Sequence, residues 1–203
     1  MPRESASARL VVLASGSGSN LQAILDACAA GDLPAQVTAV ISDRKAAYAL
    51  ERARMHAVPA VYHPFKPYAD SGKSRADYDL DLAALVRAYQ PDWVVLAGWM
   101  RLLTMPFLSQ FSQRVVNLHP ALPGTFPGTH AIQRAYAAYQ RGEIAHTGIM
   151  VHLVSDEGID DGPVLAQKIV PILPEDSLET LETRIHATEH ALLVATLRNL
   201  IEH

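Results

Sequence analysis

The sequence lacks several features that would narrow its class. Among its 203 residues there is one cysteine, Cys28, so neither a disulfide framework nor a cluster of thiolate metal ligands is expected. No apolar run reaches the roughly 20 residues of a membrane-spanning helix. The polar start Met1–Arg9 lacks the apolar stretch of a signal peptide. The formal net charge is −4 and no basic patch stands out, which disfavours nucleic acid as a partner. These absences predict a soluble, cytoplasmic protein.

What is present fits an ordinary globular chain. Apolar residues make up 49% and charged residues 19% of the sequence. The length suits about one domain with one sizeable core. We find no internal repeat and no linker rich in Gly or Ser. We therefore predict a single domain over residues 1–203, with residues 1–9 disordered.

Short apolar runs alternate with helical patterns over the first two thirds. Strands are predicted at Leu10–Ala14, Val37–Ile41, Ala60–Tyr62, Trp93–Ala97 and Val115–Leu118. Helices are predicted at Leu21–Ala30, Ala46–His56, Arg75–Tyr89 and Ala131–Arg141, and a loop at Tyr68–Ser74. Alternating strands and helices predict an α/β fold with a mostly parallel sheet and right-handed crossovers. The strands are almost wholly apolar, as expected when helices cover both faces.

The last third follows a different pattern. Gly148–Val154 and Val164–Ile172 read as two strands joined by a connector, Ser155–Gly162, that is too short for a helical crossover. This pair is therefore predicted to be antiparallel. A long final helix follows from about Ser177 to Leu200, where Asp176 and Ser177 are available as N-terminal caps.

Asn117 and His119 are the first candidates for chemistry. They lie two apart at the end of an apolar strand, so their side chains share one face, and Pro120 stops the strand there. Open α/β sheets keep their sites at strand ends. A His moves protons near neutral pH and an Asn amide stabilises an oxyanion. The alternative is that both residues merely cap the strand end.

A glycine loop, residues 15–20, joins the first strand to the first helix. Its sequence is Ser-Gly-Ser-Gly-Ser-Asn. The dinucleotide fingerprint fails because Leu21 stands where a third glycine belongs, and no Lys follows for a nucleoside-triphosphate loop. A helix N-terminus that follows a glycine loop offers free backbone amides to an anion, and here it suits a single phosphate monoester. The alternative is a tight turn in which Ser19 or Asn20 caps the helix.

Two carboxylates and several histidines remain ambiguous from their patterns. If the 155–162 connector folds over the central strand ends, Asp160 approaches His119 and raises its pKa; otherwise it lies in a solvated hairpin loop. Glu189 lies on the apolar side of the last helix, so it needs either an internal Lys or Arg or a ligand. His186 and His190 have metal-compatible helical spacing but no third ligand nearby in sequence, so no metal is expected. His152, on a predicted strand, has either a structural role or a place near the site.

Taken together, these motifs resemble the glycinamide ribonucleotide (phosphoribosylglycinamide) formyltransferase family. The resemblance runs from about Leu10 to the final helix. Its marks are residues 15–22, Leu96-Ala97-Gly98-Trp99-Met100-Arg101, Asn117-Leu118-His119-Pro120, Phe126-Pro127-Gly128, Val151-His152 and Asp160-Asp161-Gly162-Pro163. One departure is that the proline at Pro123 stands one place earlier than usual in the family, and Gly124 follows it.

The resemblance implies a fold, a reaction and a set of residues. The fold would be Rossmann-like, and the reaction would move the formyl group of 10-formyltetrahydrofolate, the co-substrate, to the amine of phosphoribosylglycinamide in purine synthesis. The chemistry needs no metal and no covalent intermediate. The implied catalytic residues are Asn117, His119 and Asp160. The implied nucleotide-binding residues are Gly18, Ser19, Asn20, His186, Ala187, Thr188 and Glu189. The implied folate-binding residues are Arg75, Met100, Arg101, Leu102, Leu103, Asn117, Ser155, Asp156, Glu157, Gly158, Ile159 and Asp160.

Other interpretations stay open at this point. A methionyl-tRNA formyltransferase would need an added RNA-binding domain and a basic surface. A formyltetrahydrofolate hydrolase usually carries an extra N-terminal regulatory domain. A non-catalytic nucleotide-binding module would use the glycine loop alone and keep His119 for structure. A monomer and a homodimer are both compatible with the sequence.

Overall fold

The computed structural model describes residues 7–203. These residues form one seven-stranded sheet in the order β3-β2-β1-β4-β5-β6-β7. The strands are β1 (Ala8–Leu13), β2 (Ala35–Ser42), β3 (Ala60–Tyr62), β4 (Trp93–Leu96), β5 (Val115–His119), β6 (His146–Leu153) and β7 (Val164–Pro171). The first five pair in parallel, whereas β6 pairs antiparallel with both β5 and β7. The predicted α/β fold with an antiparallel C-terminal pair is confirmed.

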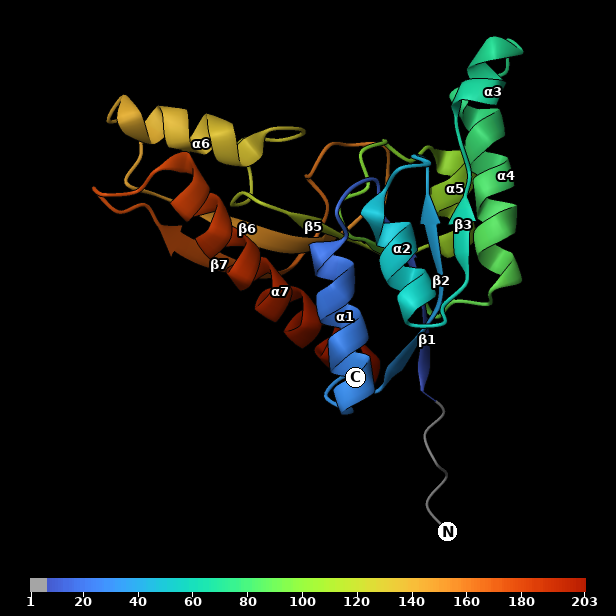
Figure 1. Ribbon diagram of the computed structural model, residues 1–203. Helices are drawn as coiled ribbons and strands as arrows, with labels where there is room; N and C mark the ends of the chain where they lie inside the picture. Colours follow the sequence, from blue (N-terminus) through green and yellow to red (C-terminus); the bar gives the residue numbers. More distant parts are fainter. Residues whose placement is uncertain (1–6) are drawn as a thin grey trace.

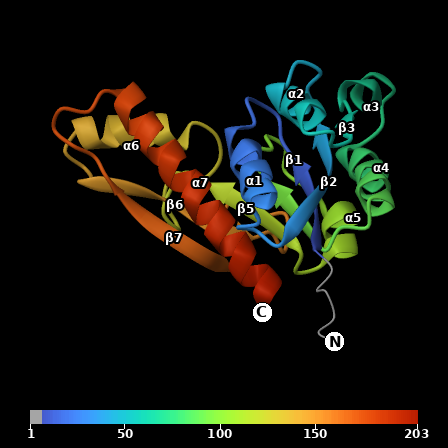
Figure 2. The same cartoon turned by 60° about the horizontal axis from the view of Figure 1, so that its bottom comes forward.

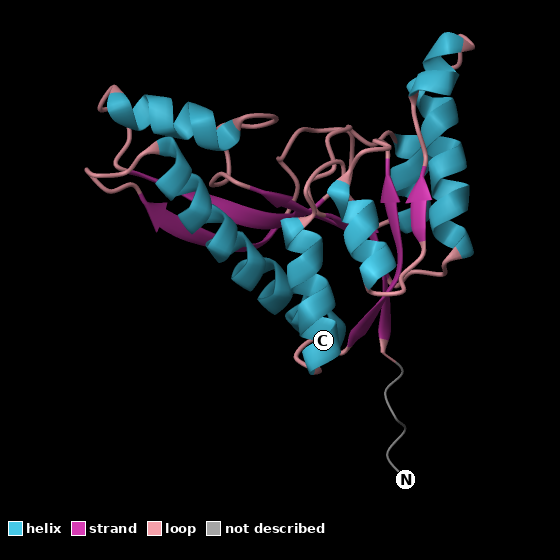
Figure 3. Ribbon diagram, viewed as in Figure 1, coloured by secondary structure: helices cyan, strands magenta, loops and turns pink. Residues whose placement is uncertain are grey.

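Helices cover both faces of this sheet (Figures 1 and 3). They are α1 (Ser19–Ala30), α2 (Tyr48–Met55), α3 (Lys66–Asp70), α4 (Arg75–Ala88), α5 (Met105–Leu108), the 3-10 turn η1 (Ser109–Phe111), α6 (Ala131–Gln140) and α7 (Leu178–Glu202). Among residues 7–203, no helix has the length and apolar character needed to cross a membrane.

Alternate strand residues supply the two main hydrophobic cores. On β1, Leu10 and Val12 pack with α1, α2 and α7, whereas Val11 and Leu13 pack with α4 and α5. All four side chains are fully buried, which explains why the strand reads as an unbroken apolar run. A third cluster joins α6 and α7 to β6 and β7.

The strand order places a switch point between β1 and β4. From β1 the chain builds outward to β2 and β3, and then crosses back to add β4 and β5 on the other side. Connections diverge there, which leaves a crevice at the carboxyl ends of the strands. Beyond β5, the antiparallel register sets His152 of β6 opposite Asn117.

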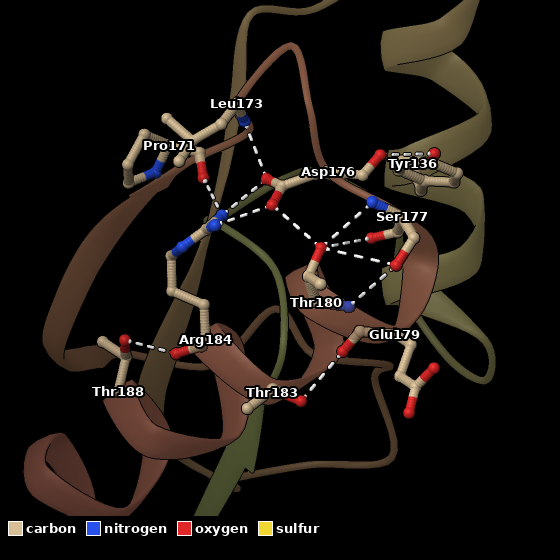
Figure 4. Close-up of polar contacts among 10 residues, drawn as sticks. All are labelled: Tyr136, Pro171, Leu173, Asp176, Ser177, Glu179, Thr180, Thr183, Arg184 and Thr188. Atoms are coloured by element: carbon tan, nitrogen blue, oxygen red, sulfur yellow. Dashed lines mark hydrogen bonds and ion pairs between the residues drawn. The ribbon is translucent and has the colours of Figure 1, made fainter.

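A polar network fixes the start of α7 (Figure 4). Ser177 and Thr180 form a capping box. Arg184 binds Asp176 through two hydrogen bonds of 2.6 and 2.7 Å, and these bonds hold the pKa of Asp176 well below its usual range. Tyr136 of α6 donates to the Asp176 carbonyl. From this anchor α7 runs back along β6 and β7 and packs on α1 (Figure 2). This path brings Glu189 of α7 into the same cavity wall as the glycine loop.

Most elements agree with the sequence prediction within two residues at each end. One correction concerns Tyr68–Ser74, where the predicted loop is helical over its first three residues because α3 spans Lys66–Asp70. The short α5 and η1 were not predicted. The strand β1 begins at Ala8, so the predicted disorder over residues 1–9 is wrong for residues 8 and 9, and residues 1–6 lie outside the described residues.

Candidate active site

A cavity of about 500 Å³ opens at the switch point. Its wall combines the glycine loop after β1, the segment after β4, the end of β5 and the connector between β6 and β7. Residues Gly18 and Glu189 lie in the same cavity wall as His119 and Asp160. The structure therefore brings together the phosphate-binding and catalytic candidates that the sequence placed far apart.

Asn117, His119 and Asp160 meet in this cavity. The Asp160 Oδ2 atom lies 3.2 Å from Nδ1 of His119, and Oδ1 accepts a 3.0 Å hydrogen bond from Nδ2 of Asn117. The side chain of His119 is 5% exposed and that of Asp160 is 12% exposed. Of the two interpretations of Asp160, convergence on His119 is therefore the one that the structure supports, and the solvated hairpin loop is wrong.

The connector between β6 and β7 delivers this carboxylate through unusual backbone geometry. Asp160 itself has a φ of 55°, in the left-handed region, and its Oδ2 accepts a 2.8 Å bond from the Gly128 amide. At Gly162 a Cβ atom would lie 1.9 Å from the Leu153 carbonyl oxygen, so the connector returns close to β6 only with glycine there. Asp160 and Gly162 of the Asp-Asp-Gly motif thus fix the direction of a carboxylate.

His152 belongs to the same cluster. Its Nδ1 faces the Leu153 carbonyl at 3.0 Å, and a carbonyl only accepts, so Nδ1 carries the hydrogen. Its Nε2 then accepts from Nδ2 of Asn117 at 3.0 Å. Both amide hydrogens of Asn117 are therefore used, one on His152 and one on Asp160. The sequence left the role of His152 open, and the structure places it where it orients the Asn117 amide.

The pKa of His119 corrects one expectation. Burial lowers its pKa, and this effect outweighs the opposing charge of Asp160 and the bond to the Phe126 carbonyl, so the net direction is downward rather than upward. For Asp160, burial raises the pKa, but the neighbouring His152, the hydrogen bond from the Gly128 amide and the charge of a protonated His119 together hold it below its usual range. Asp160 thus stays ionised beside a histidine of reduced proton affinity.

The glycine loop approaches α2 closely. Gly18 precedes α1 with a φ of 72°, and a Cβ atom there would lie 2.8 Å from the Cα and Cβ atoms of Ala49. Its side chain must therefore be a hydrogen. Arg52 of α2 donates to the Ser17 carbonyl at 2.9 Å and braces the loop from outside. In the structure no side chain caps α1, so the alternative in which Ser19 or Asn20 acts as the cap finds no support.

Glu189 and the glycine loop meet across the cavity. The Glu189 side chain is 5% exposed, and its Oε2 lies 2.8 Å from Nδ1 of His186 and 3.2 Å from Nδ2 of Asn20. The hydrogen bond with Glu189 raises the pKa of His186. Of the two interpretations of Glu189, the internal Lys or Arg partner is therefore wrong, since a histidine takes that place. The Oδ1 atom of Asn20 is buried without a partner among the described residues.

The structure divides the predicted binding residues into those that line the cavity and those that do not. Of the nucleotide set, Ala187 and Thr188 lie outside its wall, and Thr188 bonds back to the Arg184 carbonyl of its own helix. Of the folate set, the residues in the wall are Met100, Arg101, Leu102, Leu103, Asn117, Asp156, Gly158, Ile159 and Asp160. Those outside the wall are Arg75, Ser155 and Glu157.

Two of these outer residues still brace the chain after β4, which includes the predicted folate segment, Met100–Leu103. Arg75 donates to the Leu102 carbonyl, and Oε1 of Glu157 accepts from the Met105 amide at 2.7 Å. Both contacts use backbone atoms of the chain after β4. The structure therefore gives these two side chains a supporting position behind the cavity wall.

Backbone atoms contribute functional groups that sequence reasoning missed. The Phe126 carbonyl lies 3.1 Å from Nε2 of His119, and the Gly128 amide binds Asp160. The Phe126-Pro127-Gly128 motif marked this segment, but main-chain groups have no side-chain signature that would assign their roles. The departure at Pro123-Gly124 falls in a turn that the cavity wall does not include.

Comparison with known proteins defines the class. The family model described as formyl transferase matches residues 8–197. The chain therefore belongs to the formyl transferase family.

The similar proteins bear a more specific name. Phosphoribosylglycinamide formyltransferase of Schizosaccharomyces pombe is 49% identical over 96% of this chain and 97% of its own length. The protein of the same name from Mycobacterium tuberculosis is 48% identical over 98% of this chain and 87% of its own. The crystal structure of glycinamide ribonucleotide transformylase 1 from Symbiobacterium toebii has a TM-score of 0.91 and 42% identity, covering 100% of this chain and 91% of that one.

Proposed function

We propose that this protein is a phosphoribosylglycinamide formyltransferase of de novo purine synthesis. It transfers the formyl group of 10-formyltetrahydrofolate, its co-substrate, to the primary amine of phosphoribosylglycinamide. The observation that carries the proposal is the convergence of Asn117, His119 and Asp160 in one cavity with the glycine loop. The names of the similar proteins support the substrates. The proposal includes small-molecule partners and a cytoplasmic location, as the composition predicts.

The nucleotide end of the cavity suits a phosphate and a sugar. Backbone amides at the start of α1 and its positive dipole end attract the phosphate, and the glycine loop allows close approach. Glu189, held by His186 and Asn20, offers carboxylate oxygens to hydroxyl or amine donors of the ligand. The folate ring then occupies the space beside Met100–Leu103 and the 155–160 connector.

The chemistry requires attack of the amine nitrogen on the formyl carbon. A C–N bond forms, the formyl oxygen becomes an oxyanion, and the bond to folate N10 then breaks. The amine loses a proton and N10 gains one. Asn117 donates a hydrogen bond to the oxyanion, and His119 as imidazolium stabilises the same charge and passes a proton toward N10.

The proposed mechanism requires the substrate to replace contacts that the site residues make with other protein groups. Each ring nitrogen of His119 faces an acceptor, Asp160 or the Phe126 carbonyl, and Asn117 uses both amide hydrogens. A substrate oxygen that accepts from Asn117 or His119 therefore takes the place of a protein acceptor. The charge of Asp160 favours the imidazolium form of His119 and offsets part of the lowering of its pKa by burial.

Purified protein mixed with both substrates tests the proposal by the absorbance of released tetrahydrofolate. We expect turnover, and we expect His119→Ala to lower kcat by about 10²–10⁴-fold, the usual contribution of proton transfer. His146→Ala, an exposed histidine at the start of β6, is the matched control and should retain activity. Turnover undiminished in His119→Ala would refute the mechanism.

The same assay separates the other interpretations. Release of tetrahydrofolate without the nucleotide would indicate a hydrolase. Binding of phosphoribosylglycinamide with no turnover in the unaltered protein would indicate a nucleotide-binding module.

A further inference from the structure

A second carboxylate, Asp43, lies buried behind the cavity at the carboxyl end of β2. Its side chain is 2% exposed and is not part of the cavity wall. Its Oδ1 accepts a 2.6 Å hydrogen bond from the hydroxyl of Ser15, and its Oδ2 lies 2.8 Å from Nε of Arg101. A buried carboxylate is costly unless it is paired, and here each oxygen has its own partner.

The two partners of Asp43 belong to the two halves of the site. Ser15 is the first residue of the glycine loop, and Arg101 belongs to the folate segment. Ser15 also bonds to the chain after β4, because its amide donates to the Gly98 carbonyl at 3.0 Å and its hydroxyl accepts from the Met100 amide at 3.0 Å. One carboxylate therefore fixes two successive folate-segment residues, Met100 through Ser15 and Arg101 directly.

The Arg101 guanidinium depends on this carboxylate for its position. Its Cζ atom lies 4.8 Å from the centre of the Phe65 ring, so the group is held between an aromatic face and Asp43. The Arg101 side chain is 28% exposed, and Arg101 is part of the cavity wall together with Met100 and Leu102. Without Asp43, the cation keeps only the weaker aromatic contact and moves toward solvent.

We propose that Asp43 is a positioning residue that holds the folate segment in register with the glycine loop. It lies outside the cavity wall and acts through Ser15 and Arg101. The inference rests on the proposed function for the identity of the ligands. It predicts that loss of the Asp43 charge weakens folate binding and leaves the chemical step intact.

Asp43→Asn is the first test, because the amide keeps an acceptor for Ser15 and loses the charge that holds Arg101. We expect KM for 10-formyltetrahydrofolate to rise about tenfold, the loss expected for one charge-assisted hydrogen bond. We expect kcat and the KM for phosphoribosylglycinamide to stay within about twofold of their values in the unaltered protein. A change in the folate KM alone is not what a merely structural role would give.

Asp92→Asn is the matched control. This carboxylate accepts a 2.8 Å bond from the Arg9 amide at the amino end of β1, at the opposite end of the sheet from the cavity. It should leave both KM values unchanged. Two results would overturn the proposal in favour of general destabilisation. One is a rise in the folate KM of Asp92→Asn as large as that in Asp43→Asn. The other is an Asp43→Asn variant in which kcat falls and both KM values change.

Amide hydrogen exchange over residues 98–104 tests the same contacts without any turnover. Ser15→Ala removes the acceptor of the Met100 amide, and we expect faster exchange there in Ser15→Ala and in Asp43→Asn but not in Asp92→Asn. Unchanged exchange in the first two variants would refute the positioning role even if the protein is a formyltransferase. Faster exchange in these two variants, combined with no turnover in the unaltered protein, would leave the positioning role standing and refute only the proposed function.

Discussion

Asp160→Asn gives the sharpest test of the catalytic geometry. The substitution keeps the size of the side chain and an acceptor for Asn117, and removes the negative charge 3.2 Å from Nδ1 of His119. What remains around His119 is burial, which lowers its pKa most, the bond to the Phe126 carbonyl, which raises it, and the charges of His152 and Arg134, which lower it. The variant therefore isolates the one nearby group whose charge favours the imidazolium.

The magnitude follows from the contact that is lost. A carboxylate 3.2 Å from Nδ1 favours the imidazolium, so its removal lowers the pKa of His119 further, and less of the enzyme carries the needed proton. A hydrogen bond to a charged group is worth about 1.5–3 kcal/mol, so we expect kcat/KM near pH 8 to drop about 10–150-fold, with most of the loss in kcat.

The pH profile gives the sign of the effect. Protonated His119 is lost as the pH rises through its pKa, so kcat/KM declines on the alkaline side. Removing the carboxylate lowers that pKa, so the decline should begin at a lower pH in Asp160→Asn and part of the activity should return in acid. Measurement of kcat/KM from pH 5 to 9 resolves this shift.

Asp161→Asn controls for the loss of a charge in the connector. Its carboxylate is exposed and lies against Gly158. The pH profile and kcat/KM should stay unchanged in this variant. An Asp160→Asn enzyme with a thermal midpoint, kcat/KM and pH profile equal to those of the unaltered protein would show that Asp160 does not control the protonation of His119.

Two further substitutions test the surrounding structure. Gly18→Ala should lower the free energy of unfolding by about 1–3 kcal/mol and weaken phosphoribosylglycinamide binding, because the new Cβ would lie 2.8 Å from Ala49 and φ at this position is 72°. Urea unfolding measures the first effect and calorimetric titration the second. Values equal to those of the unaltered protein in both assays would contradict the close approach. Ser177→Ala should lower the free energy of unfolding, measured with urea, by about 1 kcal/mol, because the α7 cap that accepts from the Thr180 amide is lost. Ser109→Ala, an exposed serine, is the matched control and should change this free energy by less.

The larger elements were predictable because their signals repeat along the chain. The apolar run of β1 spans a strand that is buried on both faces, and Pro120 marks the end of β5 immediately after His119. The short helix α5 has four residues and begins Met105-Pro106, which gives no periodicity to detect. The helix α3 likewise spans only Lys66–Asp70. Elements of a single turn owe their existence to tertiary contacts rather than to a pattern.

The site was predictable in its side chains and not in its backbone. Asn117 and His119 stand out by spacing alone, and the family resemblance adds Asp160. The Phe126 carbonyl leaves no trace in residue types. The direction of the His119 pKa shift depends on how deeply the ring is buried, which no local pattern reports. Asp43 escaped notice because a single Asp after a strand also fits an ordinary turn.

The placement of the chain ends has a practical consequence. The first described strand residue, Ala8, and the last turn of α7, with Leu200 and Ile201, pack on the hydrophobic cluster that contains Leu33. This end of the sheet is opposite to the one that carries the cavity (Figure 1). A surface anchor or a fused protein attached beyond Glu202 would therefore project away from the entrance, which makes this end the natural handle for immobilising the enzyme with both substrates free to enter.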